Sequence, residues 1–214
     1  MVDFTGGTWR SLIDGSEVSG IPDTVVLRPE DGDLTHFEGS TDLFEIVSSP
    51  TVTQDLTLRS IGDGEGGIFS TEGLAENYPE RGIMFETFIS EETTTPVPST
   101  LFGDDIDNCY IAEISGAVDE ITLGDIEDGT IDRIESASVT IDPDTAYGQR
   151  IYWDDPEITY QLWDIDSDGN FVEQLGEVSI SDERFDGPGL GFLRESSDDD
   201  AYHEFVVLRE VLDG

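Results

Sequence analysis

Apolar residues recur along the chain in short runs that alternate with polar residues, and Gly, Pro, Asp and Asn separate the runs. A period of two predicts β-strands, since successive side chains of a strand point to opposite faces. The predicted strands are Thr24–Leu27, Leu43–Val47, Asp55–Arg59, Ile83–Ser90, Asn108–Ile114, Ser136–Ile141, Arg150–Trp153, Ile158–Ile165, Phe171–Ile180, Leu190–Arg194 and Tyr202–Val211.

No stretch carries apolar residues at i, i+3, i+4 and i+7 over three turns, so the sequence predicts little helix. About a dozen strands at regular spacing, joined by turn residues, predict an all-β antiparallel sandwich or barrel. The dipeptide Asp168-Gly169 between two alternating runs predicts a tight hairpin. The Gly-rich segment Gly62–Gly67, the Pro-rich segment Thr93–Thr100 and the acidic segment Glu120–Gly129 are interpreted as loops.

The 214 residues suit one β domain, which we place at residues 24–214. Residues 1–23 are rich in Gly and Ser and are interpreted as an N-terminal arm. Trp9, Leu12 and Ile13 have no obvious local apolar partner, and with Arg10 they are the predicted assembly residues. The alternative is a strand or strap that lies on the sandwich of the same chain.

The charge of the chain is one-sided, because fifty Asp and Glu face nine Arg and no Lys, for a net charge of -41. Such self-repulsion destabilises a compact domain, but in molar salt the Debye length falls to about 3 Å. The composition therefore predicts a protein of near-saturated brine, as in salt-loving archaea or their viruses. A nucleic-acid mimic and a calcium-loaded module remain open, whereas a disordered acidic chain is disfavoured by the aromatic content. Nucleic acid and anionic membranes are not expected partners, because no basic patch exists.

The start of the chain carries no basic leader or long apolar run, and no segment approaches the roughly twenty apolar residues of a membrane span. We therefore expect the protein to stay in the cell or to leave it in an assembled particle. Cys109 is the single cysteine, which excludes an intrachain disulfide and predicts an inert buried thiol.

From about Val25 the chain contains an ordered series of segments: LRPEDGDLTHFEG, IFSTEGL before RGIMFETFIS, LFGDDIDNCYIAEIS, YQLWDIDSDGNFVEQ, GPGLGFLRE and AYHEFVVLREV. The order of these segments resembles the concanavalin A-like lectin/glucanase superfamily in its LamG-like form. The resemblance implies a two-sheet antiparallel jelly roll and covers sugar-binding domains, glycosidases and structural modules. The N-terminal phrase GGTWRSLIDG resembles the start of structural proteins of haloarchaeal tailed viruses.

The expected chemistry is not catalytic. The paired carboxylates that a glycosidase needs would follow the pattern E-x-D-x-x-E in the glucanase branch, and no segment matches it. There is no G-x-S-x-G motif, and the only histidines, His36 and His203, do not form a nucleophile constellation. The sequence predicts no catalytic residue.

Two acidic groups are candidate calcium ligands, and no other cofactor is expected. Asp164, Asp166 and Asp168 begin a D-x-D-x-D-G pattern, but Leu175 stands where a calcium loop needs a bidentate Glu. A solvated hairpin turn is the alternative interpretation.

The second group of candidate cation ligands is Asp104, Asp105, Asp107 and Asn108, which precede a predicted strand. Carboxylate and amide oxygens at the mouth of a strand suit either a metal ion or sugar hydroxyls.

Sugar recognition needs exposed aromatic rings beside hydrogen-bonding groups. The best constellation in the sequence is Tyr152, Trp153, Asp154 and Asp155, with Trp163 on the following run. The alternative is that the two tryptophans belong to the aromatic core.

These observations combine into one functional prediction, a non-enzymatic virion structural protein of a haloarchaeal virus. It would form a capsid turret, a decoration or a tail component, assemble as a homo-oligomer with other virion proteins in the host cytoplasm, and display the jelly roll toward host surface glycans. The alternative is a carbohydrate-binding module of a haloarchaeal cell-surface or secreted protein.

Overall fold

The computed structural model describes residues 8–10, 17–19, 24–25, 34, 37–48, 56–61, 64–70, 80–89, 96–115, 118–154, 156–167, 171–187, 189–194 and 201–210. These residues form seventeen strands and one short 3-10 helix, η2 (Thr41–Leu43). None of the described helices is long and apolar enough to cross a membrane. The strands are β1 (Thr8–Arg10), β2 (Glu17–Ser19), β3 (Thr24–Val25), β4 (Glu38–Gly39), β5 (Phe44–Ser48), β6 (Leu56–Ser60), β7 (Gly66–Ser70), β8 (Glu80–Ile89), β9 (Pro96–Asp105), β10 (Asn108–Ser115), β11 (Glu120–Glu127), β12 (Thr130–Ser138), β13 (Thr145–Asp154), β14 (Glu157–Ile165), β15 (Phe171–Ser181), β16 (Gly189–Arg194) and β17 (Ala201–Glu210).

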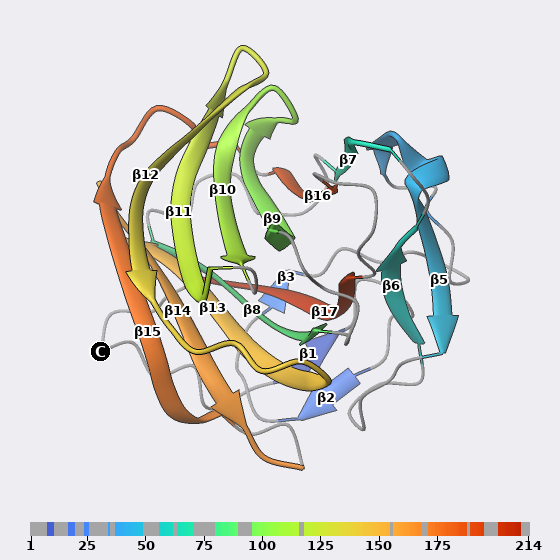
Figure 1. The fold of residues 1–214 in the computed structure, drawn as a ribbon. Coiled ribbons are helices and arrows are strands. Elements are labelled where there is room, and N and C mark those ends of the chain that lie inside the picture. Colours follow the sequence, from blue (N-terminus) through green and yellow to red (C-terminus); the bar gives the residue numbers. More distant parts are fainter. Residues whose placement is uncertain are drawn as a thin grey trace.

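Two large antiparallel sheets form the body of the protein (Figure 1). The seven-stranded sheet has the order β12-β11-β10-β9-β16-β7-β4, and the eight-stranded sheet has the order β15-β14-β13-β8-β17-β6-β5, with β3 also paired to β17. The edge strands β12 and β15 lie side by side, where the two layers meet. The predicted all-β, two-sheet antiparallel sandwich is therefore confirmed.

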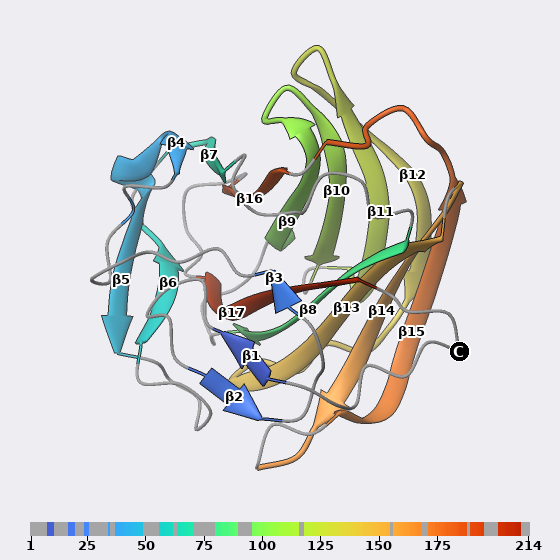
Figure 2. The ribbon, with the colours of Figure 1, turned by 180° about the vertical axis from the view of Figure 1, so that it is seen from behind.

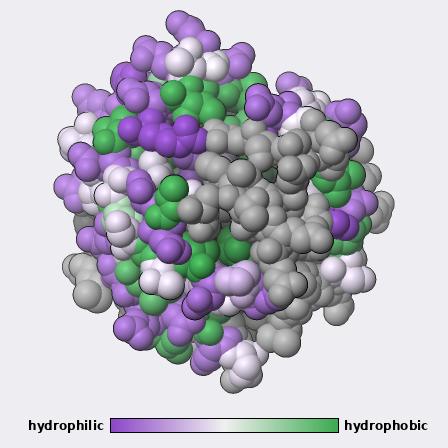
Figure 3. Space-filling view, viewed as in Figure 1, coloured by the Kyte–Doolittle hydropathy of each residue, from purple (hydrophilic) through white to green (hydrophobic). Residues whose placement is uncertain are grey.

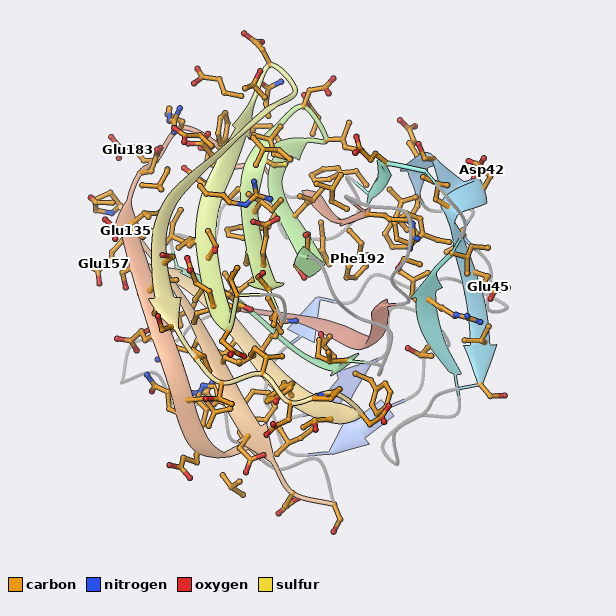
Figure 4. The ribbon with its side chains drawn as sticks, viewed as in Figure 1. Asp42, Glu45, Glu135, Glu157, Glu183 and Phe192 are labelled. Carbon is orange, nitrogen blue, oxygen red and sulfur yellow. The ribbon has the colours of Figure 1, made fainter. Side chains whose placement is uncertain are left out.

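The space between the sheets is filled by alternate residues of both layers. Phe102, Ile114 and Leu123 of the seven-stranded sheet face Ile151 and Leu162 of the eight-stranded sheet, and all are at most 1% exposed. Phe192 lies inside between the layers in Figure 4. Each such side chain contributes about 1.5–3 kcal/mol through burial, so this core is the main source of stability.

Most of the described carboxylates lie on the outside of the molecule, although Glu113 and Asp125 are buried. Figure 4 shows Glu135, Glu157 and Glu183 pointing outward on one side and Asp42 and Glu45 on the other. Hydrophilic residues likewise cover most of the described surface in the view of Figure 3. The separation of acidic shell and apolar core follows from the alternation along the strands.

Three segments interpreted as loops contain strands. Residues 93–100 run into β9, which lies between β10 and β16; Pro96 stands at the beginning of the strand, beside a register shift, where a missing N–H is tolerated. Residues 120–129 contain β11, in which Gly124 lies beside a register shift in the pairing with β12. The Gly-rich segment 62–67 runs into β7. In each case Pro or Gly concealed a strand that tertiary pairing stabilises.

The N-terminal strands β1 and β2 form a separate two-stranded sheet, with Trp9 opposite Val18 and Arg10 opposite Glu17. Strand β1 contacts β3 and β17 of the same chain, as both ribbon views show (Figure 2). The side chains of Trp9 and Arg10, and Leu12 and Ile13 entirely, lie outside the described residues. The division at residue 23 and the assembly role of the N-terminal segment stay predictions.

Candidate functional site

The outer face of β13, β14 and β15 carries a group of side chains that we call the platform: Arg150, Gln161, Trp163, Phe171, Gln174 and Glu177. Antiparallel pairing sets Trp163 opposite Gly148 on one side and Gln174 on the other. Arg150 and Glu177 likewise flank Gln161. Because side chains of paired residues lie on the same face of a sheet, these residues share the surface that faces away from the core.

Two aromatic rings form one half of the platform. The ring centroids of Trp163 and Phe171 are 6.1 Å apart at an interplanar angle of 37°, and both side chains are half-buried. The Arg150 guanidinium carbon lies 4.7 Å from the Trp163 centroid and 5.6 Å from that of Phe171. This is cation–π geometry, and it holds both rings against the sheet.

Gly148 makes room for the Phe171 ring. A Cβ at this position would lie 2.5 Å from Phe171 Cζ, closer than carbon atoms approach. The absence of a side chain on β13 therefore lets a ring from β15 reach across the intervening strand. The glycine is part of the site, although it offers no chemical group of its own.

A hydrogen-bonded chain forms the other half of the platform. Trp163 Nε1 donates to Gln161 Oε1 at 3.1 Å, and Gln161 Nε2 donates to Glu177 Oε2 at 2.6 Å. Gln174 Nε2 donates to the same carboxylate oxygen at 3.1 Å. The chain fixes the orientation of the Trp163 ring and of both amides before any ligand arrives.

The combination suits a ligand with both an apolar face and hydroxyl groups. Aromatic rings offer apolar contact area, and the exposed Glu177 carboxylate and Gln174 amide beside them offer hydrogen bonds of defined direction. Farther along the same face, Thr159 Oγ1 and Ser179 Oγ share a hydrogen bond of 2.9 Å. Because the pieces are held by one another, a ligand would need to order few side chains on binding.

The structure describes two of the five predicted sugar-binding side chains, Tyr152 and Trp163. Tyr152 pairs with Thr159, so it shares the platform face but lies four ladder positions from Trp163, about 13 Å. The side chains of Trp153 and Asp154, on β13, and Asp155 entirely lie outside the described residues. Their part in sugar binding stays a prediction.

Sequence reasoning missed most of the platform, although a signal for it existed. The predicted turn at Asp168-Gly169 sets the hairpin register, and that register places Gln174 opposite Trp163, as observed. Phe171 could not be found in this way, because a register shift between Asp164 and Ile165 moves it by one position.

Three of the four predicted cation ligands at the β9–β10 turn, Asp104, Asp105 and Asn108, accept hydrogen bonds within the protein. Asp105 Oδ1 accepts from the Asp107 amide at 2.9 Å and from Asn108 Nδ2 at 3.1 Å. Asp104 Oδ1 accepts from the Gly187 amide at 2.7 Å, and Asn108 Oδ1 from the Asp128 amide at 3.3 Å. These groups stabilise a turn and its contacts with neighbouring loops.

The second predicted cation site lies at the β14–β15 end. Asp164 pairs with Glu173 and is half-buried, Asp166 is exposed, and Asp168 lies outside the described residues. Across the described part of the chain, no group of three or more His, Cys, Asp or Glu is placed to hold a metal ion. Calcium binding at either group of residues therefore stays a prediction.

Cys109 is fully buried in β10, as predicted. Burial, and then the negative charges of Asp105 and Asp107, raise the pKa of its thiol far above the ordinary value. The thiol is therefore protonated at neutral pH, and a protonated buried thiol is unreactive.

No protein-family model and no curated protein matches the sequence. Solved structures do match the fold, and they share the concanavalin A-like jelly roll. The carbohydrate-binding module CBM66 from Bacillus subtilis has a TM-score of 0.59 at 16% identity, over 83% of this chain and 97% of that chain.

The exoplasmic/lumenal domain of VIP36, solved with Ca2+ and Man3GlcNAc, has a TM-score of 0.59 at 9% identity, over 85% of this chain and 86% of that chain. A xylan β-1,4-xylosidase from Bacillus halodurans has a TM-score of 0.52 at 10% identity, over 72% of this chain and 33% of that chain. The predicted jelly roll is thereby confirmed, and the haloarchaeal and viral parts of that prediction are not tested.

Proposed function

We propose that the protein is a non-catalytic carbohydrate-binding domain whose ligand lies on the platform. The single observation that carries the proposal is the Trp163–Phe171 pair, half-buried on an outer sheet face and flanked by a prearranged Gln161–Glu177–Gln174 chain. Two of the structures of similar fold are, by their names and bound ligands, sugar-binding domains. That likeness supports the proposal, because this fold accommodates sugars in proteins of very different sequence.

The acidic residues of the site favour binding over hydrolysis. Glycosidases cleave with two carboxyl groups about 5–10 Å apart on either side of the scissile bond. On the platform, Glu177 is the one described carboxylate, and both of its hydrogen-bond donors are amides. Glu113, a buried carboxylate of the other sheet, is held by Arg133 and Ser99. Both carboxylates are therefore oriented by protein groups that donate hydrogen bonds to them.

The biological setting that we propose is the surface of a haloarchaeal virion, as a turret, decoration or tail component that is homo-oligomeric and contacts host glycans. What supports this setting is the net charge of -41 and the N-terminal phrase GGTWRSLIDG, both properties of the sequence. The same domain on a cell-surface or secreted protein is the second candidate. For either candidate, a bound calcium ion is a further proposal.

The test of sugar binding is a glycan array in 2 M KCl, followed by titration of the best neutral glycan with three variants. Trp163→Ala removes the larger ring and is expected to weaken binding at least tenfold, whereas Trp163→Phe keeps a ring and is expected to lose less. Val172→Ala is the matched control, since Val172 is next to Phe171 in sequence and 54% exposed.

Two results would contradict the proposal. One is an array without any bound glycan, although the protein is folded by circular dichroism. The other is full affinity in Trp163→Ala. Hydrolysis of a bound glycan, abolished by one Asp or Glu substitution, would replace binding by catalysis.

A further inference from the structure

The hydrogen-bonding groups that the platform leaves for a ligand are mainly acceptors. Glu177 Oε2 already accepts from two amides, while within the described part of the chain Glu177 Oε1 accepts no hydrogen bond. The Glu177 side chain is exposed, so this second oxygen is open to a ligand. An ionised carboxylate only accepts, which makes a ligand hydroxyl its natural partner.

The positive charge of the platform, on Arg150, is not directed toward a ligand as the Glu177 oxygen is. Arg150 is only 9% exposed, and its guanidinium lies over the Trp163 and Phe171 rings. Bidentate binding of a carboxylate or sulfate needs the edge of a guanidinium directed at the anion. A cation that is buried against two rings contributes to their position instead.

A negatively charged ligand would meet the carboxylate of Glu177 on the platform. Asp164 and Glu173 occupy the ladder position next to Trp163 and Gln174, so their side chains belong to the opposite face of the sheet. The charge that such a ligand meets on the platform face is therefore that of Glu177, while the Arg150 guanidinium lies over the rings. Two carboxylates in contact are about 3 Å apart, no farther than the Debye length at 1 M salt, so they still repel.

We propose that the platform selects uncharged glycans and rejects uronates and sulfated sugars, with Glu177 as the residue that determines this specificity. The inference rests on the proposed function, because it assigns the ligand class of the same surface. Glu177 Oε1 accepts a hydrogen bond from a sugar hydroxyl, and the Trp163 and Phe171 rings contact the apolar face of the sugar. A carboxylate on the sugar meets Glu177 instead of a cation.

The experiment uses hexasaccharides in matched pairs that differ at C6. The neutral members are β-1,4-glucan, β-1,4-mannan and α-1,4-galactan, and the charged members are the corresponding glucuronan, mannuronan and galacturonan. Affinities are measured in 1 M and 3 M KCl. For any backbone that binds, the neutral member is expected to bind at least tenfold more tightly, with a smaller ratio in the higher salt.

Glu177→Gln tests the assignment of the residue. Glutamine keeps the shape and can still accept one hydrogen bond from Gln161 or Gln174, but it removes the charge. We expect the neutral-to-charged ratio to fall at least threefold in this variant. Glu135→Gln, an exposed Glu on β12 of the other sheet, should leave the ratio unchanged.

The outcomes separate the inference from the proposed function. Equal or tighter binding of a charged member overturns the inference and leaves carbohydrate binding intact. An unchanged ratio in Glu177→Gln overturns the role of this residue. If neither member of any pair binds, and the glycan array is also empty, the proposed function fails and the inference with it.

Discussion

The outer faces of the two large sheets differ in exposure. We call the buried one, on the seven-stranded sheet, the covered face, and the one at β13–β15 of the eight-stranded sheet the open face. On the seven-stranded sheet, Leu101, Cys109 and Ile111 point away from the sandwich core, yet all three are fully buried. The carboxylate that shares this face, Glu113, is 1% exposed and is held by Arg133 Nε at 2.7 Å and Nη2 at 3.0 Å. The eight-stranded sheet instead leaves its outer face at β13–β15 half open, with Glu177 exposed beside two rings.

The difference shows how to separate a structural carboxylate from one that meets a ligand in a chain with fifty acids. Glu113 has a guanidinium and the Ser99 hydroxyl as partners, so its hydrogen-bonding capacity is met by the protein. Glu177 has one oxygen bound by amides and one directed to solvent. Both residues are glutamates, so it is their hydrogen-bond partners that distinguish the structural carboxylate from the one that is available to a ligand.

The largest expected effect comes from breaking the ion pair on the covered face. Arg133→Met would leave the Glu113 carboxylate buried without its cation, which costs about 2–3 kcal/mol of unfolding free energy, less than for a fully buried pair because Arg133 is 42% exposed. Urea unfolding of wild type and variant at constant 2 M KCl measures this loss of unfolding free energy.

Two further variants make this prediction specific. The double variant Arg133→Met with Glu113→Gln should recover most of the loss, because the buried charge is gone. Glu177→Ala on the open face should cost less than about 1 kcal/mol. Equal losses for Arg133→Met and Glu177→Ala would show that the two faces do not differ as described.

Two glycines give the next largest contrast. At Gly191, on the covered face, an added Cβ would lie 2.2 Å from the carbonyl oxygen of Ile68. To relieve this clash the backbone of the paired strands β16 and β7 would have to move, which costs free energy. Gly191→Ala should therefore destabilise the fold by about 1–3 kcal/mol. At Gly148 the obstacle is the Phe171 ring, a side chain that can swing away.

Gly148→Ala should accordingly change function more than stability. We expect a loss of less than about 1 kcal/mol, together with glycan affinity reduced about as much as in Phe171→Ala. Thermal unfolding and glycan titration on the two variants separate the effects. Intact binding in Gly148→Ala would show that the Phe171 ring does not belong to the site.

The same contrast explains what the sequence can and cannot predict. Strands such as Ile158–Ile165 were found because apolar residues on one face alternate with polar residues on the other. Strand β11 was harder to find, because Gly124 stands at one of its outward positions and glycine does not favour strands. Trp163 was found as a candidate, but Arg150, Gln161 and Glu177 join it only through pairing of three strands, which no local pattern reveals.

The smallest expected effect concerns an exposed ion network at the rim of the covered sheet. Arg184 Nε donates to Asp182 Oδ2 at 2.8 Å, Arg184 Nη1 to Glu127 at 2.9 Å, and Arg184 Nη2 to Asp125. Tyr110 donates its hydroxyl proton to Asp182 at 3.0 Å. These contacts attach the β15–β16 loop to β10 and β11.

Asp182 carries the pH dependence of this attachment. Partial burial acts to raise the pKa of its carboxyl, but hydrogen bonds from the Arg184 side chain and amide and from Tyr110 outweigh it and hold the pKa below the ordinary value. A carboxyl with a lowered pKa in the folded state stabilises the fold above its unfolded pKa of about 3.9. That stabilisation is lost as the pH falls through the folded pKa.

Asp182→Asn should therefore lower the unfolding free energy at pH 7 by about 0.5–1 kcal/mol, a small value because Arg184 is 41% exposed and salt screens the pair. The difference between wild type and variant should shrink below about pH 4. Taking this difference removes the general effect of protonating the other carboxylates. Glu183→Gln is the control, since Glu183 lies in the same loop and points outward in Figure 4. A difference that stays constant from pH 7 to pH 2.5 would show that Asp182 acts through packing and not through its charge.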